Sequence, residues 1–113
     1  MKSKLISVII ISLVLAAMGC QYSKSNILPD CATVPARFAA DVLPLIHKKC
    51  ATACHNAFSA NAGGPLTNYT QIKSKAAVIK VMVETRKMPK VGSLTDAEIK
   101  VISCWVDAGA ENN

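Results

Sequence analysis

The stretch that decides the fold is Cys50-Ala51-Thr52-Ala53-Cys54-His55, in which two thiols are followed directly by an imidazole. Thiols placed in this way can add across the vinyl groups of a haem to form thioethers, and the adjoining histidine can then ligate the iron. The usual spacing has two residues between the thiols, and this chain has three. Residues four apart on a helix still share one face, so both sulfurs can reach the same edge of a porphyrin. The stretch therefore predicts one covalently attached haem c, bound through Cys50 and Cys54, with His55 on the iron.

The second axial ligand is predicted at Met88, which stands directly before a proline. A residue before a proline is pushed out of helical backbone angles, so Met88 is expected on an extended loop with its thioether held out toward the iron. Met82 is the competing sulfur, although its helical spacing is that of a core residue. His47 precedes Cys50 on the same predicted helix, and we expect it at the surface or hydrogen-bonded near a haem propionate. Ligation by His55 and Met88 leaves no open position on the iron, which favours an electron carrier over an enzyme.

The N-terminus has the composition of an export signal. Residues 1–19 begin with a basic head and continue with an apolar run that is short for a membrane-spanning helix. Small residues then lead into Cys20, which resembles the lipobox of bacterial lipoproteins, where the cysteine receives diacylglycerol; a permanent signal anchor is the alternative. We expect a signal peptide over 1–19, a lipidated tether over 20–34 and one small domain over 35–113. The expected location is the bacterial cell envelope, with a lipid anchor in the periplasm or at the outer membrane.

The chain has five cysteines, and three of them are already assigned. Cys31 and Cys104 remain as an even pair, which outside the cytoplasm is expected to form a disulfide. Such a bond would close a loop of about 70 residues and would contribute about 3 to 4 kcal/mol to stability. Two buried, reduced thiols are the alternative.

The charge of the chain is moderately basic. Removing residues 1–19 takes away two of the 13 Lys and Arg and none of the seven Asp and Glu, which lowers the net charge from +6 to +4. Only 4% of the residues are aromatic, so a nucleic-acid platform is not expected. The chain also has no glycine-rich phosphate loop and no paired acids for hydrolysis.

A face of lysines could dock acidic redox proteins, or it could be an ordinary solvated surface. Its candidate residues are Lys48, Lys49, Lys73, Lys75, Lys87 and Lys90.

The spacing of apolar residues predicts short helices along the domain. Pro44 interrupts the first, within 37–49, so we expect either a start near Asp41, with that residue as N-cap, or a longer kinked helix. Further helices are predicted over 69–73 and 76–87, after a turn-rich loop over 56–66. Thr95 and Glu98 form a capping box that opens the last helix, and a glycine at position 109 ends it.

In chain order, these features resemble a small single-haem c-type cytochrome of class I, of the bacterial lipoprotein type. The residues that carry the resemblance run from Phe38 to Asn113 and include the haem stretch, Gly63-Gly64, Met88-Pro89, Leu94-Thr95-Asp96, Trp105-Val106 and Gly109-Ala110. The resemblance implies an all-α fold of about four short helices wrapped around the covalently bound haem. It also implies His55 and Met88 as axial ligands, and single-electron transfer between redox partner proteins as the activity.

Two other functions remain open from the sequence. In the first, Met88 is labile and opens a distal site that acts on peroxide or senses a small gas. In the second there is no haem: Cys50 and Cys54 form a disulfide or, with His55, bind a soft metal in a lipoprotein adaptor.

Overall fold

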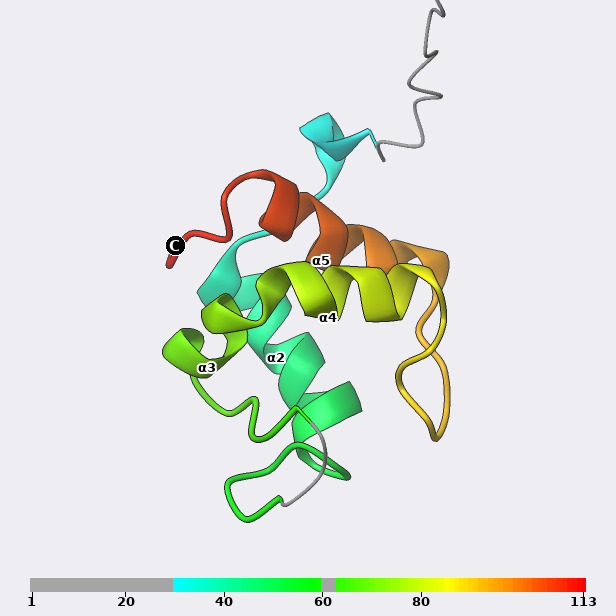
Figure 1. Cartoon of the computed structure of the whole chain (residues 1–113). Helices are drawn as coiled ribbons and strands as arrows, with labels where there is room; N and C mark the ends of the chain where they lie inside the picture. Colours follow the sequence, from blue (N-terminus) through cyan, green and yellow to red (C-terminus); the bar gives the residue numbers. More distant parts are fainter. Residues whose placement is uncertain (1–29, 60–62) are drawn as a thin grey trace, which may run out of the picture.

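The part of the chain that the structure describes is built of helices. The computed structural model describes residues 30–59 and 63–113, whose path is drawn in Figure 1. The elements are the 3₁₀ turn η1 (Cys31–Thr33), the wide helical turns η2 (Phe38–Val42) and η3 (His47–Ala51), and the α-helices α2 (Leu43–Ile46), α3 (Tyr69–Ser74), α4 (Ala76–Glu84) and α5 (Asp96–Asp107). These ranges contain no strand, which confirms the predicted all-α class.

Some predictions concern residues outside the described ranges. The signal peptide over 1–19, the lipidated Cys20 and the first ten residues of the tether all lie there. Within residues 30–59 and 63–113, no helix is both long enough and apolar enough to cross a membrane.

The first helical run continues without a break from η2 through α2 into η3. Its opening turn is wide, because the Val42 N–H donates to the Arg37 carbonyl five residues earlier, at 3.1 Å. This wide turn lies just ahead of Pro44, whose missing N–H leaves one helical hydrogen bond unmade. The prediction of Asp41 as N-cap is wrong. Arg37 occupies that position, and the Asp41 carboxylate accepts hydrogen bonds from the Arg37 backbone N–H at 2.9 Å and from its Nε at 3.1 Å.

Helix α4 is shorter than predicted, since it ends at Glu84 and not near Lys87. Arg86 adopts left-handed backbone angles, with φ of 55°. The Lys87 N–H then donates to the Met82 carbonyl at 2.9 Å, a bond that closes the helix end. The Arg86 guanidinium donates to the Leu94 carbonyl at 3.2 Å, which holds the following loop against the start of α5. The spacing of apolar residues could not predict where α4 ends, because the residues on both sides of that end are polar.

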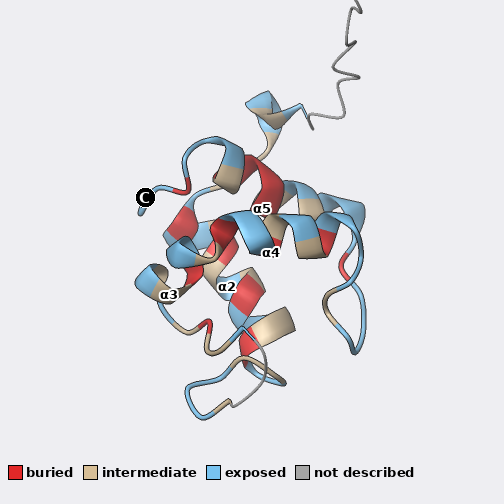
Figure 2. Ribbon diagram, in the orientation of Figure 1, coloured by how far each residue is buried: buried red, intermediate tan, exposed pale blue. Residues whose placement is uncertain are grey.

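The core is formed where α2, α4 and α5 face one another, and Figure 2 shows the buried segments of these helices. Trp105 is 1% exposed, and its Nε1 donates to the Glu111 carbonyl at 2.8 Å. Its ring lies 5.5 Å from the ring of Phe38, centroid to centroid, which joins α5 to η2. The residues of this cluster are Phe38, Val42, Ile46, Leu66, Ile72, Ala76, Ile79, Val83, Leu94, Ile102, Trp105 and Ala110.

The C-terminal residues close over the beginning of the first helical run. The Phe38 N–H donates to Asn113 Oδ1 at 2.7 Å, and the Ala39 N–H donates to the Asn113 carbonyl at 2.9 Å. The first N–H groups of a helix have no partner inside that helix, so Asn113 satisfies two of them. The Tyr69 hydroxyl donates to the Ala110 carbonyl at 3.0 Å and ties α3 to the same segment.

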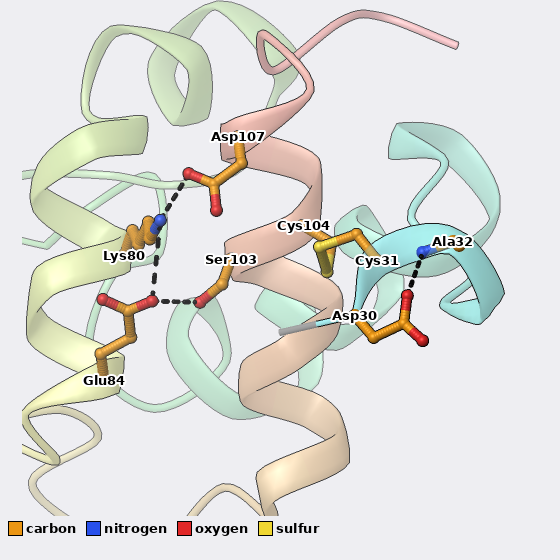
Figure 3. The surroundings of a disulfide bond; sticks show 8 residues. All are labelled: Asp30, Cys31, Ala32, Lys80, Glu84, Ser103, Cys104 and Asp107. Atoms are coloured by element: carbon orange, nitrogen blue, oxygen red, sulfur yellow. Dashed lines mark hydrogen bonds and ion pairs between the residues drawn. A yellow bond between two sulfur atoms is a disulfide. The ribbon is translucent and has the colours of Figure 1, made fainter. Parts of the chain in front are cut away.

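Helix α5 is attached on two sides, and Figure 3 shows both attachments. On one side, Cys104 forms the predicted disulfide with Cys31, with the two Cα atoms 5.5 Å apart. On the other side, the buried Ser103 hydroxyl donates to Glu84 Oε1 on α4 at 2.8 Å. Lys80 forms ion pairs with Glu84 and with Asp107. Helices α4 and α5 therefore lie side by side, as in Figure 1, and are joined by polar as well as apolar contacts.

The predicted capping box of α5 is present. The Thr95 Oγ1 accepts from the Glu98 N–H at 3.2 Å, and Glu98 Oε2 accepts from the Thr95 N–H at 2.8 Å. The bond from the Thr95 backbone, together with the nearby Lys49 ammonium, lowers the pKa of Glu98. The lowered pKa means that the folded state prefers the ionised carboxylate.

Replacing Glu98 by Gln is expected to lower the free energy of unfolding at neutral pH by about 0.3–1 kcal/mol, because the charge at the helix N-terminus is lost. The Glu98 contribution is fully present above the unfolded-state pKa, which is about 4.3, and is lost as the pH falls through the lower folded-state pKa. Urea unfolding curves of both proteins should therefore differ at pH 7 and converge below that window. Glu111→Gln, which removes an exposed carboxylate near the C-terminus, is the control. A difference between wild type and Glu98→Gln that persists unchanged into strong acid would contradict the assignment.

Candidate functional site

A cavity of about 540 Å³ brings together the residues that the sequence singled out. Cys50, Cys54, His55 and Met88 all line it, although Met88 is more than thirty residues away from the others in the chain. The volume is in the usual range for a pocket that binds a small molecule or cofactor. The other lining residues are Lys49, Ala53, Gly63, Leu66, Lys75, Val78, Ile79, Met82, Val83, Pro89, Lys90 and Val91.

The two thiols of the site come from a single helical turn. The Cys50 carbonyl accepts from the Cys54 N–H at 3.2 Å and from the His55 N–H at 2.9 Å. The three-residue spacing thus closes a regular turn, and both cysteines line the same cavity. Burial raises the pKa of the Cys50 thiol, and the neighbouring Cys54 raises it further. Cys50 is therefore held in its neutral S–H form at neutral pH.

The ring of His55 is oriented by the loop that follows it. Its Nδ1 lies 2.8 Å from the Gly64 carbonyl oxygen. A carbonyl oxygen can only accept a hydrogen bond, so Nδ1 carries a proton, and in the neutral ring Nε2 then keeps its lone pair. This is the tautomer that a metal-ligating histidine needs, and a backbone carbonyl is a common partner for its other nitrogen.

The loop after His55 needs glycine at the points where it passes the ring. Gly63 has φ of +98°, and a Cβ built there would lie 3.6 Å from His55 Cε1. The Leu66 N–H donates to the His55 carbonyl at 2.8 Å, so the loop turns back along the Cys50–His55 stretch. The sequence predicted a turn-rich loop here, but it did not indicate that the Gly64 carbonyl would select the tautomer of His55.

Replacing Gly63 by Ala is expected to reduce stability by about 1–2 kcal/mol, because a side chain is strained in left-handed backbone. Gly92→Ala is the matched control, since Gly92 has φ of +76° and nothing within 4 Å of an added Cβ. Both variants should lose similar stability in thermal unfolding. The NMR resonances of the His55 ring should move in Gly63→Ala alone. Equal displacement of those resonances in both variants would show that the loop does not orient His55.

Met88 lies in the loop after α4, outside any helix, as the following proline predicted. It is half-buried and lines the cavity from a segment other than the Cys50–His55 stretch. Met82, the competing sulfur, also lines the cavity and is half-buried on α4. The structure therefore brings both thioethers of the described residues to the site.

The charged residues of the cavity are all basic. Lys49, Lys75 and Lys90 line it, and no Asp or Glu does. Lys49 is neutralised by Glu98 at 3.4 Å, whereas Lys75 donates to the Gly63 carbonyl.

The remaining basic candidates lie away from the cavity. Lys48, Lys73 and Lys87 do not line it, and Lys73 donates to the carbonyls of Gly109 and Ala110. His47 is exposed, and its Nε2 lies 3.0 Å from the Thr67 carbonyl. Half of the predicted docking lysines are thus at the site, and His47 is not among its lining residues.

The walls of the cavity are apolar. Leu66, Ile79 and Val83 are buried and belong to the core, while Val78 and Val91 are 58% and 79% exposed at its border. A cavity that exposes apolar side chains at its border can cover an apolar ligand that remains partly open to solvent. Val78 stands on α4, whereas Val91 stands in the loop that follows it, where helical spacing gives no prediction.

Comparison with known proteins gives no match among family models, curated sequences or solved structures. Within residues 30–59 and 63–113, no group of three or more His, Cys, Asp or Glu side chains is arranged to hold a metal ion.

Proposed function

We propose that this chain is a class I c-type cytochrome, anchored to a bacterial membrane by lipid on Cys20, that carries single electrons between redox partner proteins. One haem c would be bound to Cys50 and Cys54, with His55 and Met88 as axial ligands. The observation that carries the proposal is the cavity, because it unites two thiols, an imidazole and a thioether that are separated in the sequence. The anchor rests on the lipobox-like sequence alone.

The residues present fit a haem in their chemistry. Cys50 and Cys54 offer two thiols from one turn, and His55 offers a ring nitrogen whose tautomer is already selected. Met88 supplies a soft sulfur from a separate loop, so the two predicted ligands come from different segments. The apolar walls suit a porphyrin, and the basic border suits its carboxylates.

When bound, a haem supplies an iron that accepts and releases one electron. The residues of this chain would set the conditions for that step. A hydrogen bond to Gly64 keeps the His55 ring in a single tautomer and orientation. A thioether at Met88 would favour the reduced state of iron and would leave no vacant position for a substrate, which argues for a carrier. The apolar walls would shield part of a bound haem from water.

The proposal is tested by producing the full-length protein in cells that contain a c-type haem attachment machinery. The expected product is coloured, and its absorption stays with the polypeptide after denaturation, with an intact mass equal to lipidated polypeptide plus one haem. A potentiometric titration should show a reversible transition of one electron. Colourless protein from cells that mature other c-type cytochromes would overturn the proposal, and elemental analysis of that protein would then test the soft-metal adaptor.

A further inference from the structure

Two methionines share one cavity in this protein, and a carrier with His/Met ligation uses only one. Met82 and Met88 are the methionines of the described residues, and both line the site. The two methionines belong to different structural elements. Met82 belongs to helix α4, between Ile79 and Val83, whose side chains are buried in the core. Met88 belongs to the loop that leaves the same helix.

The backbone of Met82 is also the point to which the Met88 loop is attached. The Met82 carbonyl accepts from the Lys87 N–H at 2.9 Å and from the Met88 N–H at 3.1 Å. The backbone of Met88 is therefore held next to that of Met82, at the point where the loop leaves α4. The helix that carries Met82 is fixed independently, because Glu84 and Lys80 join it to α5.

A second, small cavity lies beside the loop. It has a volume of about 70 Å³, and its lining includes Met88 and Pro89 together with Val83, Leu94 and Ile99. Met88 thus borders both cavities. Beyond Met88, the exposed residues 90–93 are joined to the rest of the domain through the Lys49 ammonium, which donates to the Ser93 carbonyl at 3.2 Å.

We propose that Met82 is a reserve axial ligand, whose thioether binds the iron when the loop withdraws Met88. Methionine suits this role, because its three rotatable bonds and its polarisable sulfur adapt to gaps in a core. Replacement of one thioether by another leaves the ligand set and the oxidation state of the iron unchanged. This proposal rests on the proposed function. A bound Met82 would keep the distal position of the iron closed to small molecules while the Met88 loop moves.

The test compares Met88→Leu with the double variant Met82→Leu/Met88→Leu in the haem-loaded protein. Leu replaces Met with little change in volume, so both variants are expected to fold. Met88→Leu should keep the absorption band of thioether-ligated ferric haem, at a shifted position, and the double variant should lose it. With Met82 bound in about nine molecules out of ten, carbon monoxide should bind ferrous Met88→Leu about tenfold more weakly than it binds the double variant. The control Val81→Leu/Met88→Leu alters an exposed residue of α4 that does not line the cavity, and it should behave like Met88→Leu.

The proposal is overturned if Met88→Leu lacks the thioether band and binds carbon monoxide as tightly as the double variant. A lysine ligand that appears equally in both variants overturns it in the same way. These results differ from failure of the proposed function, in which the wild-type protein itself would retain no haem after denaturation.

Discussion

Replacing Cys50 and Cys54 together by serine is expected to reduce covalently retained haem to background. In the proposed attachment, each thioether would form when a thiol S–H adds across a vinyl double bond, with sulfur bonding to one carbon and hydrogen to the other, and nothing is released. Serine hydroxyls lack the nucleophilicity for this addition. Because both thiols line the same cavity, each single variant should still retain haem through the remaining thioether. The measurement is intact mass and absorption after denaturation with reductant present.

The matched control is Cys31→Ser/Cys104→Ser, which also removes two cysteines. Neither of these residues lines the cavity, so this variant should keep its haem through denaturation. A Cys50→Ser/Cys54→Ser protein that keeps its pigment after denaturation would place the attachment elsewhere. The Cys50→Ser/Cys54→Ser protein should also be less stable than the loaded wild type, because the apolar walls of its cavity would lack the group that covers them.

The same control variant is expected to show the largest loss of stability in the chain. The disulfide joins positions 73 residues apart, so its removal frees a long segment of the unfolded chain. We expect the free energy of unfolding to fall by about 2–5 kcal/mol. In a domain of this size that corresponds to a decrease in Tm of about 10 °C or more. Differential scanning calorimetry of the oxidised wild type and the double serine variant measures it.

Two further measurements separate the disulfide from a general packing effect. Wild-type protein treated with reductant should match the melting temperature of the double serine variant, because both lack the cross-link. Ser103→Ala is the neighbouring control, since it breaks the bond to Glu84 on the other face of α5 and leaves the disulfide intact (Figure 3). An unchanged Tm in the double serine variant, or alkylation of both cysteines in untreated wild type, would contradict the assignment.

The sequence was most informative where a local rule acts within a few residues. The capping box at Thr95 and Glu98 was predicted and is present, because a Thr side chain and a Glu three positions later can satisfy each other's backbone donors without help from the rest of the fold. The short helix predicted over 69–73 is present as α3, and the Asn68 side chain caps it by accepting from the Gln71 N–H. The end of α4 was predicted too late, since the left-handed turn at Arg86 is supported by a bond to Leu94 that lies outside the local sequence.

By itself, the sequence determined the all-α class, the disulfide partners and the residue types of the site, because periodicity, cysteine count and the Cys50–His55 spacing depend only on positions along the chain. The tertiary structure decided that Met88 and Met82 line the same cavity as the two thiols, and that the Gly64 carbonyl selects the tautomer of His55. These relations join segments that are remote in sequence. They arise only when the α4–α5 pair packs against the first helical run. The Met88-Pro89 pattern marked Met88 as a candidate ligand, but local patterns could not determine which segments line one cavity.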